Sequence, residues 1–342
     1  MKIAIQIGEV VQRVNGLESK EMVKTLNNLA QIRMYLDADK GIKTARQSIA
    51  IGEKIFDRPH DGLIQAKVVL ARILFFKKQE HTESKTLLLD SIKMAESVYG
   101  EAHPKTANIY RHLSQFYTNQ EKHTEAIEVI DKTIAVTRKV FGNDHNRVAY
   151  VLNHKAATLY HLGRLDEAEN YYNQAVEIYT RVLGERHPLL TQILSNIGLL
   201  KYDQKDYRGA TATFRKSLSI QREVMKKTDP QIGFTLVGLG KSLVADKKSL
   251  EAEPLIRDGV KLLEDSVYAD TFYLVEAQNI LGSSLLANGK HKEAEPILAD
   301  SYEKIRKRLG SDHKKTIEAN RLLVSVYRAL GKTARLKEIE IS

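Results

Sequence analysis

The sequence predicts an all-α fold built from tandem pairs of antiparallel helices. Three observations support this prediction: a 42-residue repeat, helical spacing of apolar residues between the repeat markers, and only six prolines in 342 residues. One marker is a glycine, found at Gly100, Gly142, Gly184 and, three periods later, Gly310. A second marker is an alanine, found at Ala126, Ala168, Ala210, Ala252 and Ala294. Markers that share one period of this length are typical of a repeat architecture.

Residues 146–184 show how one repeat divides into two helices. Apolar residues at helical spacing fill the first half, and Gly163 interrupts the pattern. Asp166 suits the start of a second helix, and Gly184 suits the residue after its end, where a positive φ is needed. The apolar face of the second helix is predicted to carry Ala168, Tyr172, Ala175 and Ile178.

The register extends to both ends and gives about seven helix pairs with a half-unit at each end. The expected divisions are a partial repeat at 1–16, divergent repeats at 17–99, regular repeats at 100–310, and a half-repeat with a capping helix at 311–342. Prolines mark helix starts in this scheme. We place Pro104, Pro188 and Pro230 at the start of first helices, and Pro254 and Pro296 in the first turn of second helices.

Composition limits the function. The chain has no cysteine, which excludes disulfides, thiolate metal sites and cysteine nucleophiles. The net charge of +10 alternates in sign along the chain, with 10 basic and 5 acidic residues in 181–240 and 7 basic and 11 acidic in 241–300. The densest basic run, at 304–308, spreads around a helix, so we expect no nucleic-acid partner. No apolar run is long enough for a membrane span, and without a leader we expect a cytoplasmic protein.

The later repeats resemble the tetratricopeptide repeat family. The pattern that carries the resemblance comprises Leu281, Gly282, Leu285, Gly289, Ala294, Leu298 and Ser301. The 42-residue period and the link Leu-Gly-Glu-Arg-His-Pro at 183–188 are similar to the kinesin-light-chain-like variety. Residues 293–298, 309–313 and 329–332 also resemble the C-terminal repeats of some bacterial multidomain Ser/Thr kinases. The resemblance covers residues 100–332 well and 20–99 weakly.

The resemblance implies a right-handed superhelical solenoid whose first helices line a concave groove for a protein or peptide. Carried over through the small-residue register, the predicted groove residues are Asn108, Arg111, Gln115, Tyr150, Asn153, Tyr160, Gln192, Tyr202, Lys241, Asn279, Arg321 and Arg328. Asparagine and glutamine side chains suit a peptide backbone, tyrosines suit interface contacts, and the basic residues favour an acidic ligand.

Catalysis and cofactor binding receive little support from the sequence. The segment 238–242, Gly-Leu-Gly-Lys-Ser, has part of a phosphate-loop pattern but is expected to lie in mid-helix. His103, His145, His187 and His313 occupy the same inter-repeat turn, which implies a capping or packing role. His112 and His154 fill one position in successive repeats, but two ligands make a poor metal site. We therefore expect no catalytic residue, metal or cofactor.

Two functions remain open. The first is a non-catalytic interaction module. The second is the regulatory or substrate-recruiting C-terminal region of a larger signalling protein, such as a Ser/Thr kinase. Residues 3–14 resemble a second helix without its partner, which motivates the second function. Such a helix leaves an apolar face exposed, so we expect either a monomer or a dimer that pairs through it.

Overall fold

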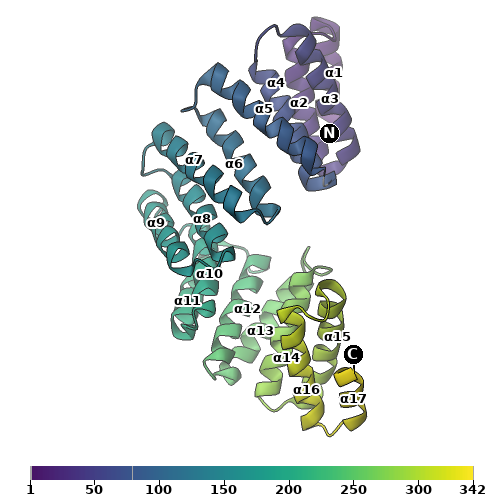
Figure 1. The fold of residues 1–342 in the computed structure, drawn as a ribbon, viewed down its shortest axis with the longest axis vertical. Coiled ribbons are helices and arrows are strands. Elements are labelled where there is room, and N and C mark those ends of the chain that lie inside the picture. Colours follow the sequence, from purple (N-terminus) through teal and green to yellow (C-terminus); the bar gives the residue numbers. More distant parts are fainter. Residues whose placement is uncertain (1, 79, 342) are drawn as a thin grey trace. The chain divides into compact units, whose positions relative to one another are not determined.

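The computed structural model describes residues 2–78 and 80–341, and this part of the chain is helical with no strand (Figure 1). The chain divides into two compact units, and the division falls within one helix, between Ile178 and Tyr179. The first unit contains α1 (Lys2–Asn15), α2 (Lys20–Leu36), α3 (Ala38–Ile55), α4 (Asp61–Ile73), the π-helical turn η1 (Leu74–Lys78), α5 (His81–Tyr99), α6 (Pro104–Asn119), α7 (His123–Phe141), α8 (Asn146–His161) and most of α9 (Leu165–Leu183). The second unit contains the rest of α9, then α10 (Pro188–Asp203), α11 (Tyr207–Val224), α12 (Pro230–Ala245), α13 (Ser249–Glu264), α14 (Phe272–Ala287), α15 (His291–Leu309), α16 (Lys314–Ala329) and α17 (Thr333–Ile341).

The helices form the predicted succession of pairs, so the all-α repeat prediction is confirmed. Seven pairs run from α2–α3 to α14–α15, with α1 before them and α16 and α17 after them. The helix α1 packs against α2. On α1, the described side chains of Ile7, Val10 and Val14 are more than half exposed, while those of residues 2–5 and 8 lie outside the described part. Pairing of two chains through this apolar face stays a prediction.

Small residues let the two helices of a pair approach closely. The five marker alanines, each on the second helix of its pair, are all completely buried. On the facing first helices, Gly198, Gly240 and Gly282 leave room for a bulky side chain of the second helix. A Cβ atom at Gly240 would lie 2.2 Å from Ile256, so even alanine would collide there. The same column therefore fixes the helix spacing in successive repeats.

The turns between repeats use a histidine cap. The glycines Gly100, Gly142, Gly184 and Gly310 have φ values of 81° to 85° and end the preceding helices, as the sequence predicts. Five histidines then accept a hydrogen bond at Nδ1 from the backbone N–H two residues later, at 3.1–3.2 Å: His60, His103, His145, His187 and His313. Asp229 accepts the equivalent bond in its own repeat. The predicted capping role is confirmed, since each bond satisfies a donor that has no partner within the helix.

Two of the proline assignments are wrong. Pro104, Pro188 and Pro230 lie in the first turn, as expected. Pro254 and Pro296 instead lie inside α13 and α15, each at the sixth residue of its helix. These helices begin earlier than the sequence suggested, because the tight turn before each of them is completed by a residue with positive φ, Lys247 or Gly289. Each proline thus removes one hydrogen bond from the second turn.

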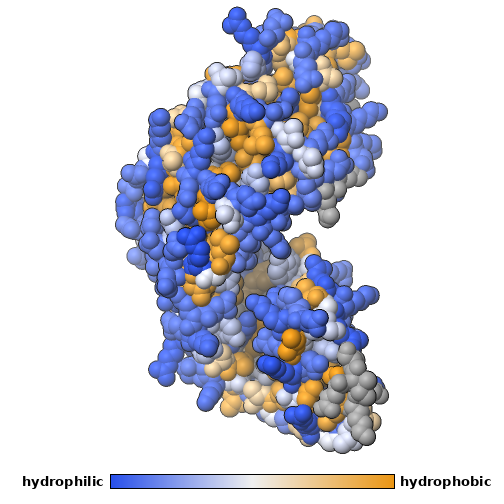
Figure 2. Space-filling model, in the orientation of Figure 1, coloured by the Kyte–Doolittle hydropathy of each residue, from blue (hydrophilic) through white to orange (hydrophobic). Residues whose placement is uncertain are grey.

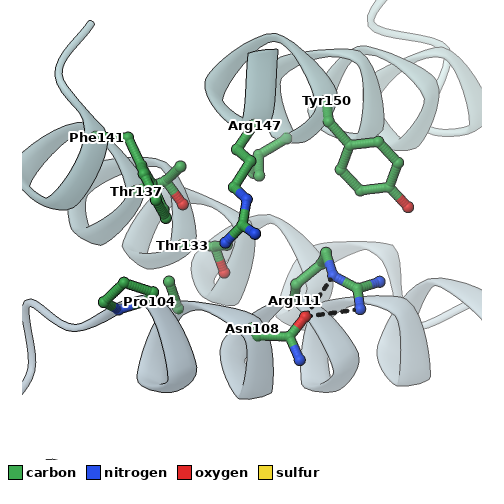
Figure 3. Close-up of a pocket in the computed structure, with 10 residues that line it drawn as sticks. Pro104, Asn108, Arg111, Thr133, Thr137, Phe141, Arg147 and Tyr150 are labelled. Atoms are coloured by element: carbon green, nitrogen blue, oxygen red, sulfur yellow. Dashed lines mark hydrogen bonds between the residues drawn. The ribbon is translucent and has the colours of Figure 1, made fainter. Parts of the chain in front are cut away.

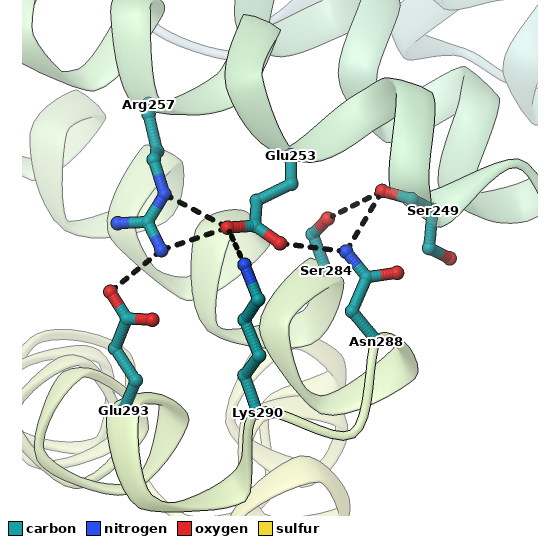
Figure 4. A network of polar contacts seen from close by, with 7 residues as sticks. All are labelled: Ser249, Glu253, Arg257, Ser284, Asn288, Lys290 and Glu293. Atoms are coloured by element: carbon teal, nitrogen blue, oxygen red, sulfur yellow. Dashed lines mark hydrogen bonds and ion pairs between the residues drawn. The ribbon is translucent and has the colours of Figure 1, made fainter.

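Ion pairs between repeats join the second helices, and the most buried one centres on Glu253 (Figure 4). Its carboxylate accepts hydrogen bonds from Arg257 at 2.9 Å, Lys290 at 2.7 Å and Asn288 at 2.8 Å. Arg257 also reaches Glu293 of the next repeat. Burial opposes ionisation of Glu253, but the three donors outweigh it and lower its pKa to about 2. The stabilisation from this network is therefore present above the ordinary pKa of 4.5 and is lost as the pH falls toward 2.

We expect Glu253→Gln to lower the free energy of unfolding by about 1–3 kcal/mol, because it removes the charge of a buried carboxylate that three donors share. The control is Glu251→Gln on the same helix, where an exposed pair with Arg215 is lost and the cost should stay below about 1 kcal/mol. Urea unfolding at pH 7 measures both variants. If both variants lose the same free energy of unfolding, burial of the network adds nothing to stability.

The histidine cap can be tested at His313, which has no stacked aromatic neighbour within the described residues. His313→Ala should lower the free energy of unfolding by about 1 kcal/mol, because the N–H of Lys315 loses its acceptor. His313→Asp should preserve stability, since Asp229 caps α12 in the same way. If alanine and aspartate variants unfold at the same urea concentration, the cap has no role in stability.

Candidate functional site

The first unit holds a pocket of about 370 Å³ bounded by α6, α7 and α8 (Figure 3). Its lining residues are Pro104, Ala107, Asn108, Arg111, Thr133, Thr137, Phe141, Arg147, Tyr150 and Val151. Among the described residues no aspartate or glutamate lines it. The pocket therefore combines an apolar floor with two guanidinium groups and one amide.

The repeat register builds this pocket. Pro104 and Asn146 open α6 and α8 directly after their histidine caps, so both first helices start at the same point of the repeat. Asn108 and Tyr150, 42 residues apart, then occupy equivalent positions one turn into their helices. The last turn of α7 supplies Phe141 to the same pocket.

The two arginines of the pocket are held by aromatic rings rather than by carboxylates. The guanidinium carbon of Arg147 lies 4.7 Å from the ring centroid of Phe141, and that of Arg111 lies 5.9 Å from the centroid of Tyr150. Arg111 also donates to Oδ1 of Asn108 at 2.9 Å. Neither arginine forms an ion pair with any residue in the described part of the chain. Stacking on a ring orients a guanidinium but leaves its charge uncompensated.

Burial and the positive charge of nearby arginines lower the pKa values of two histidines. Burial, together with Arg111 and Arg72, lowers the pKa of His112 to about 3. Burial and Arg111 lower the pKa of His154 to about 4. Both rings are therefore neutral at pH 7, and Nε2 of His112 can accept the hydrogen bond from Arg111 at 3.1 Å.

The predicted residues of the second unit have a different electrostatic setting. The ammonium nitrogen of Lys241 lies 4.2 Å from the ring centroid of Tyr202. Burial lowers the pKa of Lys241, while the carboxylates of Asp203, Glu318 and Glu276 oppose that shift. Because these carboxylates compensate its charge, Lys241 is less suited than Arg111 to attract an acidic ligand.

The other predicted groove residues do not share this pocket. Gln115, Asn153 and Tyr160 are half-buried, and Gln192, Arg321 and Arg328 are exposed. Asn279 accepts a hydrogen bond from Ser301 at 3.1 Å, so its amide is engaged within its own repeat. None of the twelve predicted residues is fully buried. The structure thus brings Asn108, Arg111 and Tyr150 together in one pocket, and ligand contact at all twelve positions stays a prediction.

Sequence reasoning missed Arg147, Thr137 and Phe141. Arg147 lies three residues before Tyr150, and the same column holds Lys105 and Lys315 in other repeats. The other repeats hold Leu189, Gln231 and Tyr273 at this position, so the signal was partial. Thr137 and Phe141 come from a second helix, where the predicted groove had no positions.

The segment with part of a phosphate-loop pattern lies inside α12, as expected, and its two glycines are buried. Within the described residues, no group of three or more histidine, aspartate or glutamate side chains is placed to hold a metal ion. No helix in that part of the chain is long and apolar enough to cross a bilayer. On the face drawn in Figure 2, hydrophilic residues dominate and apolar residues form separate patches.

Comparison with known families decides the classification. Tetratricopeptide repeat profiles match residues 106–181, 147–223, 64–105 and 274–313, which together make up more than half of the chain. The chain belongs to the tetratricopeptide repeat family. Among curated proteins no sequence matches it significantly. The resemblance to kinase C-terminal repeats rests on the sequence pattern alone.

Solved structures share the fold at low sequence identity. The repeats of a putative kinesin light chain from P. anserina align with a TM-score of 0.51 and 19% identity, over 60% of this chain and 97% of that one. The quorum sensor NprR from B. thuringiensis, in its apo form, aligns with a TM-score of 0.61 and 16% identity, over 99% and 90%. The signal transduction ATPase PH0952 from Pyrococcus horikoshii, which has a tetratricopeptide repeat sensor, aligns with a TM-score of 0.65 and 14% identity, over 99% and 52%.

The buried neutral histidines make stability depend on pH. Below the ordinary histidine pKa of 6.5 the unfolded chain binds protons that folded His112 and His154 do not, so stability falls from about pH 6.5 toward pH 4. Each histidine should contribute up to about 1.4 kcal/mol per pH unit in this range. Between pH 6.5 and pH 5.5, the free energy of unfolding measured with urea should fall less in the double variant His112→Gln/His154→Gln than in the unmodified chain. An identical loss in both proteins would contradict the assignment.

Proposed function

We propose that this protein is a non-catalytic scaffold whose first unit binds an acidic segment of a protein or peptide. The observation that carries the proposal is the pair of uncompensated guanidinium groups, Arg111 and Arg147, in a pocket without acidic residues. Guanidinium groups bind carboxylates with two parallel hydrogen bonds, and removal from water strengthens such bonds. Asn108 adds an amide that suits a peptide backbone, and Tyr150 adds apolar contact area with a polar tip.

The remaining predicted groove residues extend this proposal along the array. Gln115, Asn153 and Tyr160 follow the pocket on α6 and α8 and would contact the rest of the ligand. In the second unit, Gln192, Tyr202, Lys241, Asn279, Arg321 and Arg328 are proposed as further contacts. There the mixture of acidic and basic side chains around Lys241 favours a ligand segment of mixed charge.

A second candidate is a sensing or recruiting region of a larger signalling protein. The observation that favours it is the alignment of nearly all of this chain with about half of PH0952, a signal transduction ATPase described as having a sensor of this repeat type. A Ser/Thr kinase context would be one form of this function. Both candidates use the same pocket, so the binding test below applies to each.

We expect a peptide pool rich in aspartate, glutamate and aromatic residues to yield ligands for the full chain. The double variant Arg111→Gln/Arg147→Gln should weaken binding of the selected peptides by about tenfold or more, because charge-assisted hydrogen bonds are lost. Fluorescence anisotropy at low and high salt measures the effect, and the affinity should fall with salt.

The matched control is Arg138→Gln, an exposed arginine on α7 that does not line the pocket. Its affinity for the same peptides should equal that of the unmodified chain. Equal affinity for the double variant, or binding that is insensitive to salt, would contradict the proposal.

A further inference from the structure

A second basic pocket lies next to the first, between α2, α4 and α6. Its volume is about 230 Å³, and its walls include Arg72, Lys105 and His112. Asn108 lines both pockets, so the two share a wall on α6. Both pockets lie within the first unit.

Arg72 has a buried donor without an acceptor. Its Nε atom is inaccessible, and the side chain forms no hydrogen bond or ion pair with the residues that the structure describes. Arg72 itself is partly exposed and lines the pocket, and a guanidinium group without a carboxylate partner favours an anionic ligand there. The charge of Arg72 acts on the same imidazole, His112, as the charge of Arg111.

The one carboxylate in this pocket does not compensate Arg72. Asp61 accepts hydrogen bonds from Lys105 at 2.6 Å and from Gln65 at 3.2 Å, and the hydroxyl of Tyr99 donates to it as well. These donors belong to α4, α5 and α6, so Asp61 joins the helices together. Its charge is matched by Lys105, which leaves Arg72 as the positive group of the pocket.

We propose that this second pocket binds an acidic side chain, and that the first unit therefore recognises two acidic residues of one peptide. One residue would contact Arg72, the other would contact Arg111 and Arg147, and Asn108 would bind the backbone between them. This inference rests on the proposed function and adds the spacing of the acids. Packed helices lie about 10 Å apart, and an extended chain advances about 3.3–3.6 Å per residue, which favours acids three positions apart.

The test uses acetylated, amidated nonapeptides in a Gly/Ser/Tyr host, bound to the full chain. One series carries a single glutamate, and another carries two glutamates separated by one to six positions. Fluorescence anisotropy measures the dissociation constants for the unmodified chain and for Arg72→Gln, Arg147→Gln and the control Arg138→Gln.

The inference predicts that two glutamates at a spacing of three bind about tenfold more tightly than one. Arg72→Gln should abolish this gain, while binding of the single-glutamate peptides stays measurable and shows that the variant is folded. A gain that is independent of spacing, or that persists in Arg72→Gln, contradicts binding of an acidic residue in the second pocket. If Arg147→Gln still weakens binding in that case, the proposed function stands. Absence of binding by every peptide, or indifference to Arg147→Gln, overturns both.

Discussion

The close approach of two helices at a column of small residues is the constraint on which the rest of the structure depends. The marker alanines are completely buried, and a Cβ atom on Gly198, Gly240 or Gly282 would collide with a side chain of the partner helix. Most repeats then begin at a side-chain cap such as His103 or His145, whereas Thr271 before α14 makes no such bond. A regular repeat then presents the same positions of its first helix in register, which is how Asn108 and Tyr150 come to share a pocket.

In the first unit, some basic side chains are paired with carboxylates and others are not. Lys155 is buried but paired with Asp131 at 2.5 Å and with the hydroxyl of Tyr171 at 2.8 Å, an arrangement that stabilises the helices. Arg111, Arg147 and Arg72 have no such carboxylate in the described residues. Unpaired positive charges beside buried neutral histidines disfavour the folded state, because the charges repel and their solvation is reduced. The acidic ligand that we propose would supply the missing partners.

The repeat period predicted most of the fold because its markers act locally. Glycines with positive φ and histidine caps each act within one turn, and the buried alanines act within one helix pair, so their spacing in the sequence was sufficient. The interior positions of Pro254 and Pro296 and the π-helical turn η1 were not predictable in this way. They depend on where a helix starts or how it ends against its neighbours, and a single sequence carries no direct signal for that.

The candidate site was predictable only in part. Asn108, Arg111 and Tyr150 followed from the register of the first helices. Phe141 required contacts between three helices, and the role of Glu253 required side chains from the next repeat. The compensation of Lys241 by Glu276 and Glu318 likewise joins residues that lie 35 or more positions apart. Electrostatic balance is a property of the packed array, so composition and spacing do not reveal it.

The most direct measurement of the central claim is an NMR titration that follows the Nε–Hε signals of the arginine side chains as an acidic peptide is added. We expect the signals of Arg111 and Arg147 to shift together and saturably, while the signal of Arg138 stays in place. Shifts confined to arginines of the second unit, with Arg111 and Arg147 unchanged, would contradict the claim.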